Sequence, residues 1–298
     1  MRVTKTFAET RDACSGRVGL VPTMGFLHEG HLSLIEGARR ENDTVVMSLF
    51  VNPLQFDRKD DLVRYPRNLE RDVDLAASAG ADIVFAPEVD EMYPAEQLTR
   101  VNVKGLSDEL EGPNRPGHFE GVATVVAKLF AGVQPQRSYF GRKDAQQLAV
   151  VRRMALDLSL PTEVIGVPIV READGLALSS RNIFLTNEQR LVALGLSRGL
   201  LAAADLVESG ERDAKAITNA VYFEIGDGLN VEYVALAGQD LVQPLTTLDR
   251  PAFLALAAWS GETRLIDNVH LDAARDGFVG DRGVRLGEPS VLYQTGDN

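Results

Sequence analysis

Two histidines lie three residues apart in the segment Pro22–His31, which reads PTMGFLHEGH. A strand-like apolar run enters this segment, Gly25 provides a turn, and a helical pattern begins at Gly30. We expect His28 and His31 to share one side of that helix start. Backbone N–H groups at a helix N-terminus attract anions, and a neutral imidazole can donate a hydrogen bond to a phosphate oxygen. The pattern indicates a triphosphate site whose donors act most strongly as charge builds on the α-phosphate.

A second polar cluster, LALSSRN, occupies Leu176–Asn182. Ser179 and Ser180 can donate hydroxyl hydrogen bonds, and Arg181 can bind phosphate through two N–H groups. Ser-Ser-Arg alone is common in loops. Together with the histidine pair upstream, it indicates a flexible phosphate clamp.

Other chemistries stay open for these residues. The histidine pair could be half of a metal site or two surface residues. The chain contains no G-x-x-x-x-G-K-[ST], no G-x-G-x-x-G after a strand and no G-x-S-x-G. These absences exclude a P-loop, a dinucleotide fingerprint and an α/β-hydrolase nucleophile.

Charge and composition exclude further classes. The 298 residues carry a net charge of −12, which argues against a nucleic-acid binder because phosphate contacts need clustered Lys and Arg. Cys14 is the single cysteine, so no intrachain disulfide is possible and a reducing compartment fits. No segment resembles a signal peptide, since residues 1–9 are polar and mixed in charge, and no apolar run reaches the roughly 20 residues that span a bilayer. We expect a cytoplasmic protein without nucleic-acid or membrane partners.

The elements that must position these residues alternate between strand and helix over 1–175, which predicts a Rossmann-like parallel sheet wrapped by helices. Such sheets bind ligands beyond the carboxyl ends of their strands. The expected strands are Arg17–Pro22, Thr44–Val51, Asp82–Pro87, Arg137–Gly141 and Thr162–Val170, and the expected helices are Gly30–Arg40, Asn68–Ala79, Val122–Phe130 and Ala145–Leu158.

The pattern of apolar residues over 176–298 predicts a smaller α+β domain. A helix is expected over Asn187–Glu208, and strands over Val231–Ala237, Pro251–Trp259 and Thr263–Asp267. From about residue 270 the chain is rich in glycine and charge, and we expect a loosely packed tail there.

Longer motifs around these residues resemble the pantothenate synthetase family of HIGH-type nucleotidyltransferases, a superfamily that also holds class I aminoacyl-tRNA synthetases. The resemblance covers roughly Val18–Asn268 and keeps the family's motif order. Its pieces are PTMGFLHEGH, SLFVNPLQF (48–56), YPRNLERD (65–72), RPGHFEGV (115–122), YFGRKDAQQL (139–148), GVPIVREADGLALSSRN (166–182) and TRLIDN (263–268).

The resemblance implies a role for each matching position. The residues implied to bind ATP are Met24, Gly25, Phe26, Leu27, His28, Glu29, Gly30, His31, Gly141, Arg142, Lys143, Asp144, Val170, Leu178, Ser179, Ser180 and Arg181. Those implied to act in catalysis are His28, His31, Lys143, Ser179, Ser180 and Arg181. Within the ATP set, the family places His31 at the α-phosphate as the conventional proton donor, Asp144 at the ribose and the Val170 backbone at adenine.

The resemblance also implies substrate and metal contacts. Gln55 and Gln147 would hold pantoate, Arg115 would reach the anions of the site, and Asp72 would help to hold Mg²⁺. Simpler interpretations stay open for these positions. The glutamines could be satisfied polar residues, and Asp72 could be a solvated helix charge. Lys143 and Asp144 could likewise be an ordinary helix-start pair, and His118 suits a structural role.

The implied activity is an ATP-dependent condensation of pantoate with β-alanine through an acyl adenylate, in a homodimer whose second domain closes as a lid. Three alternatives remain at this stage. Another HIGH-type nucleotidyltransferase would leave a nucleotide on its product, a metal hydrolase would use His28 and His31 as ligands, and a nucleotide sensor would keep the fold without turnover.

Overall fold

The computed structural model describes residues 1–56, 62–63 and 65–293. Contacts divide the chain into two compact units, Met1–Val167 and Pro168–Asn298. The division falls at Pro168, a few residues before the position after Gly175 at which the sequence pattern changes.

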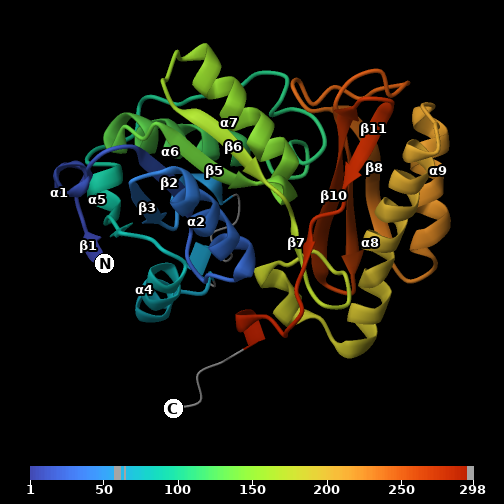
Figure 1. The fold of residues 1–298 in the computed structure, drawn as a ribbon, viewed down its shortest axis with the longest axis horizontal. Helices are drawn as coiled ribbons and strands as arrows, with labels where there is room; N and C mark the ends of the chain where they lie inside the picture. The colour runs from blue at the N-terminus through green and yellow to red at the C-terminus, as the bar shows by residue number, and fades with distance from the viewer. Residues whose placement is uncertain (57–61, 64, 294–298) are drawn as a thin grey trace. The chain divides into compact units, whose positions relative to one another are not determined.

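A parallel sheet of six strands forms the first unit, in the order β1-β4-β3-β2-β5-β6 (Figure 1). β-Branched and apolar residues fill the central strands, as expected where both faces of a sheet are covered. The Rossmann-like fold class is therefore confirmed. The strands are β1 (Arg2–Thr4), β2 (Val18–Thr23), β3 (Thr44–Leu49), β4 (Ile83–Phe85), β5 (Arg137–Gly141) and β6 (Glu163–Val167).

Helices cover both faces of this sheet because its connections run in two directions. The helices are α1 (Phe7–Ala13), α2 (Glu29–Glu41), α4 (Leu69–Ser78), α5 (Val89–Met92), α6 (His118–Val133) and α7 (Ala145–Asp157). The connections β2-α2-β3 and β3-α4-β4 run toward one edge, and α2 contacts α4. The connections that contain α1, α6 and α7 run toward the other edge, and α6 contacts both α1 and α7. Right-handed crossovers in opposite directions place their helices on opposite faces.

The proline at position 168 ends the first sheet. The sequence predicted one strand over Thr162–Val170, but β6 stops at Val167 and β7 (Val170–Arg171) pairs with β12 (Val284–Arg285) instead. Proline has no backbone N–H to continue a ladder, which accounts for the interruption.

The second unit is an antiparallel sheet in the order β11-β10-β9-β8 with two helices against it (Figure 1). Its elements are α8 (Asn187–Glu208), α9 (Ala214–Ile225), β8 (Asn230–Gly238), β9 (Ala252–Ser260), β10 (Thr263–Ala274) and β11 (Gly277–Asp281). One apolar core joins α8 and α9 to the inward residues of β8, β9 and β10. The predicted α+β character is confirmed, while α9 was not predicted.

The segment from about residue 270, for which a loosely packed tail was predicted, contains paired strands in its described part. His270 and Leu271 are buried, and β10 continues to Ala274, where it turns into β11. A strand with one exposed face needs apolar residues only on its buried face. Glycine and charged residues on the outer face made the apolar alternation of this hairpin too weak to recognise in the sequence. Within the described residues, no helix is long and apolar enough to cross a bilayer.

Candidate active site

Several predicted site residues of the first unit follow the carboxyl ends of three adjacent strands. The segment Met24–His31 follows β2, Gln55 follows β3, and Lys143 and Asp144 follow β5. The chain leaves β2 toward β3 but leaves β5 toward β6, so β2 and β5 flank the point at which the strand order reverses. Ligands of doubly wound sheets bind at this point.

The loop after β2 has an unusual backbone. Gly25 has φ +87°, and a Cβ there would lie 2.8 Å from the Asp72 carboxylate. Phe26 is also left-handed, with φ 54°. This region is unfavourable for a bulky side chain, and such residues persist only where their surroundings impose the conformation. The strain marks the loop as a functional segment.

Two adjacent residues of α4 hold this loop in place. The Asp72 carboxylate accepts hydrogen bonds from the backbone N–H groups of Phe26 at 2.7 Å and Leu27 at 2.8 Å. Arg71 donates through Nη1 to the Leu27 carbonyl oxygen at 3.0 Å, and its guanidinium lies 5.3 Å from the centre of the Phe26 ring. A charged pair on α4 therefore holds the backbone of Phe26 and Leu27 in place.

Asp72 is not a solvated helix charge, because its side chain is only 1% exposed. Burial raises the pKa of the carboxyl, while the hydrogen bonds from Leu27 and Phe26 oppose that shift. The contacts do not fit a resident metal site: each oxygen already accepts a backbone N–H, and the cation of Arg71 lies 3.5 Å away. In the part of the chain that the structure describes, no three His, Cys, Asp or Glu side chains form a metal-binding group. The geometry favours a loop-holding role for Asp72.

His28 and His31 lie together at the start of α2. His28 is the extended residue just before the helix, and its ring centre lies 4.1 Å from that of His31. The His31 Nδ1 atom accepts a hydrogen bond from the backbone N–H of His28 at 3.3 Å. An accepting Nδ1 carries no proton, so this contact assigns the neutral ring's hydrogen to Nε2.

Both imidazoles are held in their neutral form. Burial lowers the pKa of His31 to about 4, where Asp144 works against the shift and Lys143 adds to it. Burial also lowers the pKa of His28 well below 6.5, with smaller contributions from His31, Lys143 and Arg71. At neutral pH the pair can donate hydrogen bonds without repelling an incoming cation. Lys143 and Asp144 thus act on His31 through their charges.

Gln55 contacts the loop after β2, called here the nucleotide loop after the role that the resemblance implies for it, and is itself held by Asn52 and His118. Its Nε2 atom lies 3.0 Å from the sulfur of Met24, and its Oε1 accepts from Asn52 Nδ2 at 3.1 Å. Tyr93 donates to Asn52 Oδ1 at 2.8 Å, and His118 Nδ1 lies 2.8 Å from the Gln55 carbonyl oxygen. The structural role predicted for His118 is therefore seen in the contact to Gln55.

The adjacent glutamines of α7 differ in their surroundings. Gln146 is buried and holds a loop: its Nε2 donates to the carbonyl oxygens of Leu106 and Glu109, and its Oε1 accepts from Glu111 N–H. Gln147 is half-buried. The partial exposure of Gln147 is compatible with its predicted role in binding a ligand, whereas Gln146 is used within the protein. Arg115 is also half-buried, and its charge acts on His118.

The remaining predicted residues belong to the second unit. Ser179 and Ser180 are half-buried and Arg181 is exposed, so their polar groups are accessible. The Ser179 hydroxyl accepts from the Arg181 backbone N–H at 3.3 Å. The side chains of Val170 and Leu178 are buried, as is that of Leu27 in the first unit. Their backbone groups are also in use: Leu178 N–H donates to the Val170 carbonyl oxygen at 2.9 Å, and Leu27 bonds Asp72 and Arg71 as described above.

Comparison with known proteins now identifies the family. A family model described as pantoate-beta-alanine ligase matches residues 1–270.

The chain belongs to the pantoate-beta-alanine ligase family.

Similar members of this ligase family are named pantothenate synthetase. That of Moorella thermoacetica is 56% identical over 257 residues, which cover 86% of this chain and 91% of the relative. That of Roseiflexus sp. is 51% identical over 278 residues, which cover 92% of this chain and 100% of the relative.

Solved structures of the family share the fold. The crystal structure of pantothenate synthetase from Thermus thermophilus matches with a TM-score of 0.85 and 52% identity, covering 90% of this chain and 98% of that one. The Francisella tularensis pantoate-beta-alanine ligase, complexed with "Beta-gamma ATP and Beta-alanine", matches with a TM-score of 0.72 and 33% identity, covering 90% of this chain and 97% of that one.

Three residues that hold the site of this family member were not predicted. Asn52 and Arg71 lie inside motifs that carried the resemblance, and the Asn-Pro turn directly after a buried strand was a signal for Asn52. Tyr93 had no such signal, because it lies in the irregular segment after α5.

Proposed function

We propose that this member of the pantoate-beta-alanine ligase family makes pantothenate in two steps through an enzyme-bound pantoyl adenylate. A free carboxylate is a poor acyl donor because its leaving group would be oxide. In the first step a pantoate carboxylate oxygen attacks the α-phosphorus of ATP, and the bond to the β,γ-diphosphate breaks. Pyrophosphate leaves with that bonding pair.

The second step forms the amide. The neutral amine of β-alanine attacks the acyl carbon of the adenylate, the acyl–oxygen bond breaks, and AMP leaves with its electron pair. The amine proton passes to solvent. No protein nucleophile is needed. The adenylate must be kept from water, and the lid predicted for residues 176–298 would exclude water from the site.

The two histidines and Lys143 would serve the first step as hydrogen-bond donors and as a positive charge. The tautomer of His31 leaves Nε2–H available, and its lowered pKa keeps the ring neutral. His31 therefore acts as a preorganised neutral donor to the α-phosphate, which differs from the proton-donor role that the resemblance implied. Ser179, Ser180 and Arg181 would add donors to the phosphates.

Orientation of the substrates would come from groups without charge. The Gln55 and Gln147 amides suit the hydroxyls and carboxylate of pantoate, and the contact of Gln55 with Met24 joins this part of the site to the nucleotide loop. Mg²⁺ would enter as the counter-ion of ATP and so would be part of the co-substrate. The homodimer and the cytoplasmic location remain predictions.

The single observation that supports this function most strongly is the convergence of the loop after β2, Gln55 and Lys143 at the strand-order switch of a chain in this family. A metal hydrolase is disfavoured by the state of His31. Its Nδ1 lone pair accepts from the His28 backbone N–H and its Nε2 carries the proton, so neither nitrogen offers a lone pair to a metal.

Pyrophosphate exchange tests the proposal. ATP and pantoate without β-alanine should support exchange of labelled pyrophosphate into ATP, and β-alanine should then release AMP and pantothenate. Normal overall turnover without exchange would contradict the adenylate. A product that retains AMP or CMP would instead indicate another nucleotidyltransferase.

A further inference from the structure

The residues beyond 270 lie outside the family match, yet they pack against the segment that leads to the phosphate clamp, Ser179–Arg181. Val284 N–H donates to the Ile169 carbonyl oxygen at 2.7 Å, and Leu286 N–H donates to that of Arg171 at 2.9 Å. Arg285 Nε donates to the Ala173 carbonyl oxygen at 2.7 Å. The segment 282–293, called here the C-terminal strap, therefore pairs with residues 169–173.

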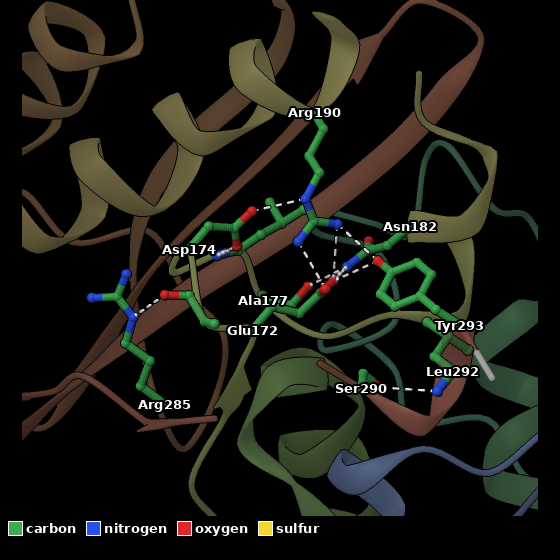
Figure 2. Close-up of polar contacts among 11 residues, drawn as sticks. Glu172, Asp174, Ala177, Asn182, Arg190, Arg285, Ser290, Leu292 and Tyr293 are labelled. Carbon is green, nitrogen blue, oxygen red and sulfur yellow. Dashed lines mark hydrogen bonds and ion pairs between the residues drawn. The ribbon is translucent and has the colours of Figure 1, made fainter. Parts of the chain in front are cut away.

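The end of the strap reaches a buried acid. The Tyr293 hydroxyl donates to Glu172 Oε1 at 3.0 Å and accepts from Arg190 Nη1 at 2.7 Å. Burial raises the pKa of Tyr293 to about 12, and Glu172 adds to the shift, so the hydroxyl keeps the proton that it donates. Figure 2 shows the Arg190 guanidinium between Asp174 on one side and Glu172 with Tyr293 on the other.

Glu172 connects the strap to the clamp. Its Oε1 atom also accepts from Asn182 Nδ2 at 2.6 Å, and Asn182 directly follows Arg181 (Figure 2). The same Nδ2 atom donates to the Ala177 carbonyl oxygen at 3.1 Å, and the Asn182 backbone N–H donates to that of Ser179 at 2.9 Å. Asn182 thereby holds both ends of the short segment that contains the clamp.

This arrangement needs several partners at once. Glu172 is 5% exposed, and a buried carboxylate is stable only when it is paired and hydrogen-bonded. Arg190 supplies a charge to Glu172 Oε2 at 2.7 Å, while Asn182 and Tyr293 both donate to Oε1. Removal of the tyrosine hydroxyl leaves Oε1 with the donor of Asn182 and a longer contact of 3.3 Å from Arg190 Nη1. Glu172 and Asn182 therefore gain freedom together.

We propose that the C-terminal strap is a positioning element for the phosphate clamp, acting from Tyr293 through Glu172 and Asn182 to Ser179–Arg181. Tyr293 touches no substrate in this scheme. It sets how well ordered the clamp is before ATP arrives. The inference rests on the proposed role of Ser179–Arg181 in adenylation.

Tyr293→Phe is the first test, because it removes only the hydroxyl. The matched control is Tyr222→Phe, at an exposed tyrosine of α9. We expect Tyr293→Phe to raise the KM for ATP or to slow single-turnover adenylation by about three- to tenfold, the range of one lost hydrogen bond. Pantoate affinity measured without ATP should stay at the wild-type value. Hydrogen exchange of the backbone amides of 178–182 should speed up, and Tyr222→Phe should change none of these.

A chain that ends at Gly287 is the second test, since it keeps β12 and removes the Tyr293 contacts. It should show the same pattern as Tyr293→Phe, with a larger effect. Wild-type ATP kinetics and wild-type exchange of 178–182 in Tyr293→Phe would overturn the inference, whether or not the shortened chain folds. Equal losses of ATP and pantoate binding would also overturn it, because they would indicate general destabilisation. Absence of pyrophosphate exchange in the wild-type protein would contradict the proposed function instead, and the hydrogen-exchange result would still report on the strap.

Discussion

The backbone N–H of His28 donates to the Nδ1 atom of His31 at 3.3 Å. This contact uses one ring nitrogen of His31 and leaves the other, Nε2, with the proton. The orientation of a catalytic imidazole is usually fixed by the hydrogen bond made at its other nitrogen. Here the main chain of the nucleotide loop provides that bond. A change in the loop backbone would therefore also reorient the Nε2–H group of His31.

The variants His31→Gln and His31→Asn should show which ring nitrogen of His31 donates to the substrate. The amide nitrogen of glutamine can reach the region of Nε2, whereas that of asparagine reaches only the region of Nδ1. We expect His31→Asn to slow adenylation by about 10²–10³-fold, the usual cost of one such donor, and His31→Gln to recover at least about tenfold of it. Single-turnover adenylation is the measurement. Equal rates for the two variants would argue against donation from Nε2.

Gln147→Ala and Gln146→Ala should fail in different ways. Gln147→Ala should weaken pantoate binding by about 10- to 100-fold, because a buried polar partner left unpaired costs about 1–3 kcal/mol. Gln146→Ala should instead lower the free energy of unfolding by a similar amount, since three hydrogen bonds to the loop 106–111 are lost. Calorimetric titration with pantoate and urea unfolding measure the two effects. Weaker pantoate binding in Gln146→Ala alone would reverse the assignment.

Asp72→Asn tests the loop-holding role against a metal role. Asparagine offers one acceptor oxygen, so it can satisfy only one of the two N–H groups of Phe26 and Leu27. We expect adenylation to slow by about 10- to 100-fold, corresponding to about 1.4–2.8 kcal/mol, with no change in the Mg²⁺ concentration that gives half-maximal rate. Asp74→Asn, at an exposed position of the same helix, is the control. A large shift in the Mg²⁺ requirement would restore the metal role.

His118 should make the protein sensitive to acid. Burial lowers its pKa from 6.5 to about 4, so the unfolded chain binds more protons than the folded chain between these values. The free energy of unfolding should therefore fall as pH falls through this window. His118→Asn keeps a donor for the Gln55 carbonyl oxygen but cannot titrate. Between pH 7 and 4.5 it should lose about 2 kcal/mol less stability than the wild type in urea unfolding. Equal losses in both proteins would show that His118 does not titrate in this way.

Local patterns predicted most of the first unit. The strand β2 and the helix α2 arise from apolar periodicity and turn residues that lie near one another in the chain. His28 and His31 lie between the same two elements or at the start of the helix. The contacts that complete the site join distant segments instead. Asp72 meets Phe26 across 46 positions and His118 meets Gln55 across 63, so sequence spacing carries no information about them.

The second unit was harder to predict for a different reason. The helix α9 has small and polar residues between its apolar ones, and β11 contains glycine and aspartate. Tertiary packing on α8 and pairing with β10 stabilise these elements more than their own propensities do. Tyr293 contacts a residue 121 positions earlier, which no local pattern could indicate.

The left-handed backbone of Phe26 has a consequence for attempts to make this protein more heat-resistant. Glycine or asparagine at this position would tolerate φ 54° better and would relieve the strain that Asp72 and Arg71 now impose. A search that rewards only a higher melting temperature would therefore favour such substitutions. Its products would lose the aromatic ring over which Arg71 lies, and the nucleotide loop would gain freedom at the moment when it must be rigid. Thermostability and turnover are thus expected to compete at this single position.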